Sequence, residues 1–182
     1  MNRKLLVTLH LYLAAFFTPM VLLVGITGGL YLFGIKSAGE TTQVAALAGQ
    51  TLNVPKEAAQ AKEYIDGLLQ QATIEHSYDY VRAQGPAATT RPTHRTHFQL
   101  RQADDGIQIN KVEPNLMMTM LELHKGHGPQ WFRTFEMIFA LGLVLVMLTG
   151  FWLGLQSPML RKPTLLLTVG GTVVAGLLAF VL

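Results

Sequence analysis

The sequence contains no cysteine among its 182 residues. A chain without thiols forms no disulfide and has neither a thiolate nucleophile nor a CxxC redox pair. It also cannot attach a c-type haem covalently or hold an iron–sulfur cluster through cysteine. Any redox chemistry in this protein would therefore need a bound cofactor that other side chains hold.

Charge is missing from three long stretches, because residues 5–35, 137–156 and 163–182 contain no Asp, Glu, Lys or Arg. About 20 consecutive apolar residues are enough for a helix to cross the hydrocarbon core of a bilayer. The sequence therefore predicts three transmembrane helices. The first apolar run is about twice the usual 7–15 residues of a signal peptide's hydrophobic region, so we expect a retained anchor.

Basic residues lie before the first of these stretches and between the second and third. Arg3 and Lys4 precede the first span, and Arg161 and Lys162 lie in the short link between the second and third. Short basic flanks favour the cytoplasmic side of a membrane. We expect the N-terminus inside, and residues 36–132 and Leu182 outside.

The long loop between the first two spans has the pattern of a small α+β domain. Residues 37–51, rich in Ala, Gly, Thr and Gln, resemble a linker, and residues 53–72 predict a helix with Pro55 in its first turn. The segments HSYDYVRAQ, THRTHFQLRQ and IQINKVE alternate as strands do, with a loop at residues 85–92 and a hairpin turn at ADDG. The segment PNLMMTMLELHKGHG predicts a further helix that ends at Gly126 or Gly128.

The expected fold class is a mainly α membrane protein with three transmembrane helices and a small extracytoplasmic domain, one helix plus a three-stranded antiparallel sheet, between the first two. The expected boundaries are 1–35 for the first span, 36–114 for the domain, 115–132 for a helix and loop approaching the membrane, 133–156 for the second span, 157–163 for a cytoplasmic link and 164–182 for the third span. No Walker loop, GxGxxG, GxSxG or HExxH motif is present, and a nicotinamide or flavin domain has no room.

A short pattern occurs twice, once for each of the first two spans. Leu-His lies near the start, at His10 and His124, and Thr-Gly lies near the end, with Thr27 and Thr149. Each copy also has a Gly-x-x-x-Gly pair, which typically packs apolar helices closely, at Gly25/Gly29 and Gly150/Gly154. Because the two spans run in opposite directions, the repeat is inverted. An ionisable side chain inside an apolar run is a functional candidate, and the alternative is an interfacial imidazole.

The combination of LHLYLAAFF, GITGGLYLFG, LELHKGHG and LVLVMLTGFWLGL resembles the PepSY-associated transmembrane family. The resemblance covers residues 5–155 and makes the outer domain PepSY-like. It implies an inner-membrane protein that binds haem b and reduces ferric siderophores or chelates. It also implies that His10 and His124 ligate the haem iron, with His127 a further candidate ligand. Many relatives have four or more spans, and here the third expected span has no histidine.

The number of ligands is a physical constraint on this hypothesis. A low-spin haem needs axial ligands on both faces, and His124 and His127 are three residues apart on one expected helical face. They cannot clamp one iron alone, so we expect a homodimer, with one or two haems per protomer or haem shared across the interface. Candidate axial substitutes that more often serve packing are Met20, Met137 and Met147.

An alternative is a non-redox accessory module whose outer domain binds a partner protein or modulates a protease or transporter. A weaker one is direct metal binding for import. We expect surface positions for His76, His94 and His97, and a solvated strand face for Arg82, Arg91, Arg95 and Arg101. Lipid is the expected environment, the electron donor stays open, and no nucleic-acid partner is expected.

Overall fold

The computed structural model describes residues 2–35 and 39–181. Ser37, where the expected linker begins, and Leu182, expected outside, lie beyond the described residues.

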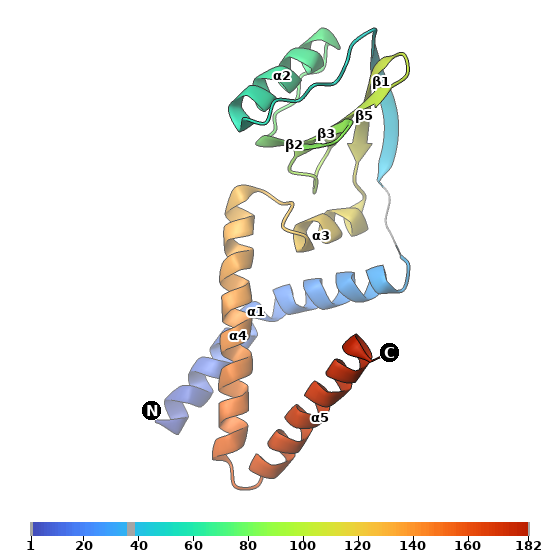
Figure 1. The fold of residues 1–182 in the computed structure, drawn as a ribbon. Coiled ribbons are helices and arrows are strands. Elements are labelled where there is room, and N and C mark those ends of the chain that lie inside the picture. The colour runs from blue at the N-terminus through green and yellow to red at the C-terminus, as the bar shows by residue number, and fades with distance from the viewer. Residues whose placement is uncertain (1, 36–38, 182) are drawn as a thin grey trace. The chain divides into compact units, whose positions relative to one another are not determined.

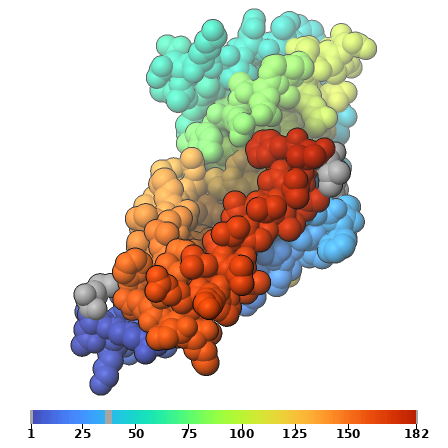
Figure 2. Space-filling model, turned by 60° about the horizontal axis from the view of Figure 1, so that its bottom comes forward, coloured from blue at the N-terminus to red at the C-terminus, as the bar shows by residue number. Residues whose placement is uncertain are grey.

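Three helices in the described part of the chain are long and apolar enough to cross a membrane (Figure 1). They are α1 (Arg3–Leu32), α4 (Gln130–Gln156) and α5 (Arg161–Phe180). None of the described α5 side chains is buried, and the face of α5 turned to the viewer in Figure 2 (orange to red) is uncovered. A helix that is apolar all round and has no protein cover requires a nonpolar solvent. The three predicted spans are therefore confirmed as candidates, and the protein is a multi-pass membrane protein.

The chain divides into two compact units, one of residues 1–21 with 137–182 and the other of residues 22–136. The division falls within α1, two residues after Pro19. Proline has no amide hydrogen and removes one hydrogen bond from the helix backbone at this point.

The second unit contains a five-stranded antiparallel sheet in the order β1-β5-β4-β3-β2 (Figure 1). The strands are β1 (Glu40–Ala48), β2 (Tyr80–Gln84), β3 (Ala87–Arg91), β4 (His97–Ala103) and β5 (Gly106–Glu113). The three predicted strands correspond to β2, β4 and β5. The predicted ADDG turn joins β4 to β5, since Ala103 pairs with Gly106. An α+β domain with an antiparallel sheet between the first and second spans is confirmed, but three strands is too low a count.

The first missed strand, β1, lies in the segment expected to be a linker. It pairs with β5 from Glu40 opposite Glu113 to Ala48 opposite Gly106. Its side chains are exposed at seven positions and half-buried at two. The two half-buried side chains, Ala45 and Leu47, pack against the core, but they lie among apolar and polar residues that do not alternate, so no period-two signal is present. Long-range backbone pairing, not side-chain pattern, makes this segment a strand.

The second missed strand, β3, lies in the expected loop of residues 85–92. Only Gly85 and Pro86 form the turn, with Gly85 at a φ of +56°, and Ala87 already pairs with Gln84. The remaining Ala and Thr residues form a hairpin with β2. Glycine and proline mark a turn without fixing its length, and this turn is shorter than expected.

Helix α2 (Ala58–Gln71) covers the core of the sheet domain. Its apolar face buries four residues, Ala61, Ile65, Leu68 and Leu69. Ile65, Leu68 and Leu69 pack in one cluster with sheet residues that include Leu100, Ile107 and Ile109. The helix begins at Ala58, so the placement of Pro55 in its first turn is wrong.

Helix α3 (Leu116–His124) has clear signals at both ends. The Asn115 side chain accepts a hydrogen bond from the Met118 amide, which caps the first turn. At the other end Gly126 has a φ of +71°, its amide bonds Leu123 and the His127 amide bonds the Glu122 carbonyl. This is a Schellman motif, which stops a helix with glycine in the left-handed region. The prediction that the helix stops at Gly126 is therefore confirmed, and its last helical residue is His124.

We predict that Ile65→Ala destabilises the sheet domain by about 2–5 kcal/mol, because a fully buried side chain leaves a cavity. Hydrogen exchange of the β4 and β5 amides in the detergent-solubilised chain measures the loss. Val44→Ala, at a side chain 43% exposed on β1, is the control and should change little. Equal effects of the two variants would contradict this assignment of the core.

Candidate functional site

His10 lies on α1 and contacts the Thr-Gly pair of α4 within the first unit. Its Nδ1 is 2.9 Å from Thr149 Oγ1, and a Cβ added to Gly150 would lie 3.1 Å from its Cε1. The Thr149 hydroxyl is also 2.7 Å from the Leu145 carbonyl, to which it donates. In the described residues Nε2 of His10 has no hydrogen-bond partner.

His124 is the last residue of α3 and contacts the Thr-Gly pair of α1 within the second unit. Its Nδ1 is 2.7 Å from Thr27 Oγ1, and the Thr27 hydroxyl donates to the Leu23 carbonyl at 2.6 Å. A Cβ added to Gly28 would lie 3.5 Å from Cε1 of His124. Thr27 is fully buried. Here too Nε2 of the imidazole is without a partner in the described part of the chain.

The two histidines therefore occupy the same local environment, built twice. Each Leu-His meets the Thr-Gly of the other copy of the sequence pattern, His10 with Thr149 and His124 with Thr27. The sequence identified all four of these residues but not their pairing. An inverted repeat brings the start of one copy beside the end of the other, and this reciprocity is what the structure adds.

The glycines of the pattern differ in their surroundings. Gly150 faces His10, and a Cβ on Gly154 would lie 2.5 Å from Thr164 Oγ1 at the start of α5. Gly25 and Gly29 have no described atom within 4 Å of an added Cβ, so their packing role stays a prediction. Gly28, which is not part of the Gly25/Gly29 pair, is the glycine beside His124. The Thr-Gly dipeptide itself was the signal that could have identified it.

His127 is not on the same helical face as His124, because the chain leaves α3 at the Gly126 turn. Its Nδ1 lies 2.7 Å from the carboxylate of Glu122, and its carbonyl accepts the Thr93 amide. The expectation that the two histidines are helical neighbours is therefore wrong. His127 is attached to the sheet domain, whereas His124 contacts α1.

Glu122 is the buried carboxylate at the centre of this contact, with its side chain 9% exposed. It receives hydrogen bonds from the Thr93 hydroxyl at 2.5 Å, from His127 and from Lys125, and it lies 3.6 Å from the Arg91 guanidinium. Burial raises its pKa, but the bonds from Lys125, Thr93 and His127 outweigh burial and lower the pKa to about 2. Sequence reasoning missed Glu122, since one acidic residue in a helix gives no signal of burial.

Two side chains expected at the surface are buried instead. Arg91, at the end of β3, is 8% exposed and pairs with Glu122, so it cannot belong to a solvated face. His97 on β4 is 1% exposed and its Nδ1 bonds the Arg95 carbonyl. Burial lowers the pKa of His97 and keeps it neutral. His94, the other histidine of this segment that we expected at the surface, is half-buried and lies before β4.

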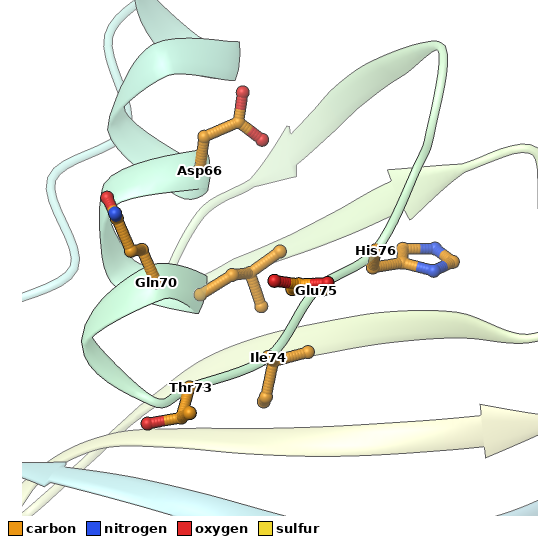
Figure 3. A pocket seen from close by; sticks show the side chains of 7 residues that line it. Asp66, Gln70, Thr73, Ile74, Glu75 and His76 are labelled. Carbon is orange, nitrogen blue, oxygen red and sulfur yellow. The ribbon is translucent and has the colours of Figure 1, made fainter.

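A hollow of about 660 Å³ lies at the C-terminal end of α2 (Figure 3). It is lined by Asp66, Leu69, Gln70, Thr73, Ile74, Glu75 and His76. The His76 ring extends away from α2 and packs edge-on against Phe98, with 4.9 Å between ring centroids. Asp66 is paired with Lys62 at 3.0 Å. In the described residues no group of three His, Cys, Asp or Glu side chains could hold a metal ion, so neither this hollow nor the Glu122 cluster is a metal site of that kind.

The low pKa of Glu122 predicts loss of stability in acid. Its pKa falls on folding from a usual value of 4.5 to about 2, so the unfolded chain binds more protons as the pH drops. Stability from Glu122 is therefore fully present above pH 4.5 and is lost as the pH falls towards 2. Unfolding of the second unit, followed by hydrogen exchange against pH, measures this, and Glu122→Gln should flatten the curve. Glu63→Gln, on the exposed side of α2, should leave the curve unchanged; flattening by both variants would contradict the assignment.

The sequence matches the PepSY-associated TM region family over residues 7–172. No curated protein and no solved structure matches the chain. The matched range includes most of α1, the sheet domain, α4 and the first part of α5, and with them both pairings of histidine and threonine. The chain belongs to the PepSY-associated TM region family.

Proposed function

We propose that this protein is a haem b-containing electron-transfer protein of a bacterial inner membrane that reduces ferric iron, held in a siderophore or another chelate, on the outer side. The observation that supports this proposal best is the repeated histidine site. Both His10 and His124 direct Nδ1 to a threonine and leave Nε2 without a partner in the described residues. Imidazole nitrogen suits haem iron, and a ligating histidine typically bonds a neighbour through its other nitrogen.

The surroundings of the two imidazoles fit a flat, apolar group. α1 and α4 carry no charge near either threonine, and Gly28 and Gly150 keep bulk away from the rings. The open side of α1 at Gly25 and Gly29 leaves space beside this helix. Bound haem b would supply one-electron transfer between the membrane and a ferric substrate. The residues proposed to hold it are His10 and His124.

The charged flanks support an orientation for the two sites. Arg3, Lys4, Arg161 and Lys162 favour the cytoplasmic side, which places the N-terminus and His10 on the inner side. His124, on the short helix after the sheet domain, then belongs to the outer side. Electrons would enter from the membrane or the cytoplasm, and the ferric chelate would approach beside the sheet domain.

A second axial ligand has to come from elsewhere. In the described residues the side-chain partner of His10 is Thr149 and that of His124 is Thr27, and neither histidine bonds a second imidazole. A homodimer would supply the missing ligands, with one or two haems per protomer or haem shared between protomers. His127 stays a candidate, because Glu122 fixes its Nδ1 and directs the ring. A carboxylate on Nδ1 makes an imidazole a stronger donor through Nε2.

The purified full-length protein from haem-replete cells should show the reduced Soret and alpha bands of haem b. His10→Ala and His124→Ala should each lose haem, because each removes one ligand. His76→Ala, at a histidine packed on Phe98 in the sheet domain, is the control and should keep the full spectrum. A colourless wild-type preparation would contradict the proposal.

A second prediction concerns the glycines beside the imidazoles. Gly150→Ala places a Cβ 3.1 Å from the His10 ring, tighter than an ordinary contact, whereas Gly29→Ala meets nothing within 4 Å. Gly150→Ala should therefore lower the haem content, and Gly29→Ala should not. Both variants add the same methyl group to an apolar helix, so helix propensity alone predicts no difference between them. Absorbance at the Soret band per mole of protein measures the ratio, and equal values would count against the His10 site.

One observation favours a different function. β1 is an edge strand of nine residues, and its free edge has no strand partner in the described chain. Such an edge can accept an added strand from a partner protein. The alternative is therefore a non-redox membrane module whose outer domain binds a protein partner, such as a protease or transporter. A stoichiometric partner that binds at β1, together with no haem spectrum, would favour this alternative.

A further inference from the structure

The two threonines that contact the histidines have only one hydroxyl proton each, and its position can be assigned. Thr27 Oγ1 is 2.6 Å from the Leu23 carbonyl, and Thr149 Oγ1 is 2.7 Å from the Leu145 carbonyl. A carbonyl oxygen only accepts, so each hydroxyl must donate its proton to the carbonyl one turn earlier. The same oxygen can then only accept from the imidazole. Nδ1 of His10 and of His124 therefore carries the hydrogen.

This assignment fixes the chemistry of the other ring nitrogen. A neutral imidazole with hydrogen on Nδ1 has its lone pair on Nε2, the nitrogen without a partner in the described residues. An imidazole that could rotate or change tautomer would offer this lone pair only part of the time. In an apolar segment water is not available to replace the threonine as acceptor. Each threonine thus holds one imidazole in the tautomer that can bind a metal.

Other threonines of the apolar helices provide an internal comparison. Thr18 on α1 donates to the Ala14 carbonyl at 2.7 Å, and Thr172 on α5 donates to the Thr168 carbonyl at 2.8 Å. Bonding to the carbonyl one turn back is a general habit of threonine in helices, so this bond alone assigns no role. No histidine bond to Thr18 or Thr172 is present in the described residues. What distinguishes Thr27 and Thr149 is the imidazole that donates to them.

We propose that Thr27 and Thr149 are positioning residues that set the tautomer and the donor strength of His124 and His10, and through them the reduction potential of the iron that each histidine binds. This inference rests on the proposed function and goes further, because it assigns a separate tuning residue to each site. Hydrogen bonding at Nδ1–H raises the basicity of Nε2, and a more basic ligand stabilises ferric over ferrous iron. Loss of the hydroxyl should therefore raise the potential of one site only.

The test uses the full-length protein with haem and the isosteric variants Thr27→Val and Thr149→Val. Spectroelectrochemical titration should show one haem component moving to higher potential in each variant, and a different component in each. A tenfold change in the preference for ferric iron corresponds to about 59 mV for a one-electron couple. Haem affinity should fall by about 10–100-fold, the usual effect of removing the hydrogen-bond partner of a metal ligand.

Two kinds of control separate tuning from folding. Thr27→Ser and Thr149→Ser keep the hydroxyl and should restore the wild-type potential. Thr18→Val and Thr172→Val remove an equivalent bond to the helix backbone at threonines that bond no histidine in the described residues. These two variants should leave both reduction potentials unchanged. In haem-free protein, ¹⁵N NMR of the imidazoles should show hydrogen on Nδ1 of both histidines, and a mixture of tautomers at one of them in each valine variant.

The outcomes distinguish the two proposals. A wild-type protein without haem overturns the proposed function, and the tuning role with it. A wild-type protein with haem, in which Thr27→Val and Thr149→Val behave as Thr18→Val and Thr172→Val do, leaves the proposed function intact and overturns the tuning role alone. A shift of both components in each single variant would also overturn it, because the two threonines would then not act separately.

Discussion

The hydrogen bond from an imidazole to a threonine hydroxyl is the interaction on which the candidate site depends. Apolar segments of a membrane protein offer no water, so a polar side chain there must find its partner within the protein. A histidine meets this requirement with one nitrogen, at Thr149 or Thr27. The threonine in turn uses the helix backbone. The result is a chain of three polar groups, imidazole, hydroxyl and backbone carbonyl, which leaves Nε2 of each imidazole without a partner in the described residues.

The sheet domain depends on a different kind of interaction. Its core lies under α2, and α3 is attached to the sheet domain through a buried ion pair between Glu122 and Arg91. Removing one partner of a buried ion pair leaves the other unpaired in a medium of low polarity, which is far more costly than never having buried the pair. Glu122 and Arg91 are therefore better understood as fixing where α3 attaches to the sheet than as adding to the overall stability. The hydrogen bonds from Thr93 and His127 complete that attachment.

The spans, α2, α3 and three of the strands could be predicted because each carries a local pattern: absence of charge, an apolar stripe, a capping asparagine and glycine, or alternation. The histidines and threonines of the candidate site could be predicted as well, because polar residues in apolar runs are conspicuous. β1 could not be predicted, since its exposed side chains leave no pattern and only its pairing with β5 defines it. Glu122, Arg91 and His97 could not either. Burial of a charged or polar side chain follows from contacts distant in sequence, such as that from β3 to α3.

The Schellman turn at Gly126 has a mechanical consequence. It ends α3 immediately after His124, so this helix of nine residues makes two of its side-chain contacts in its last turn. Glu122 binds the sheet domain, and His124, two residues later, binds α1. Side chains two positions apart point to different sides of a helix, so α3 contacts the sheet domain on one side and α1 on another. The sheet domain and the imidazole of His124 are therefore connected through less than one turn of α3.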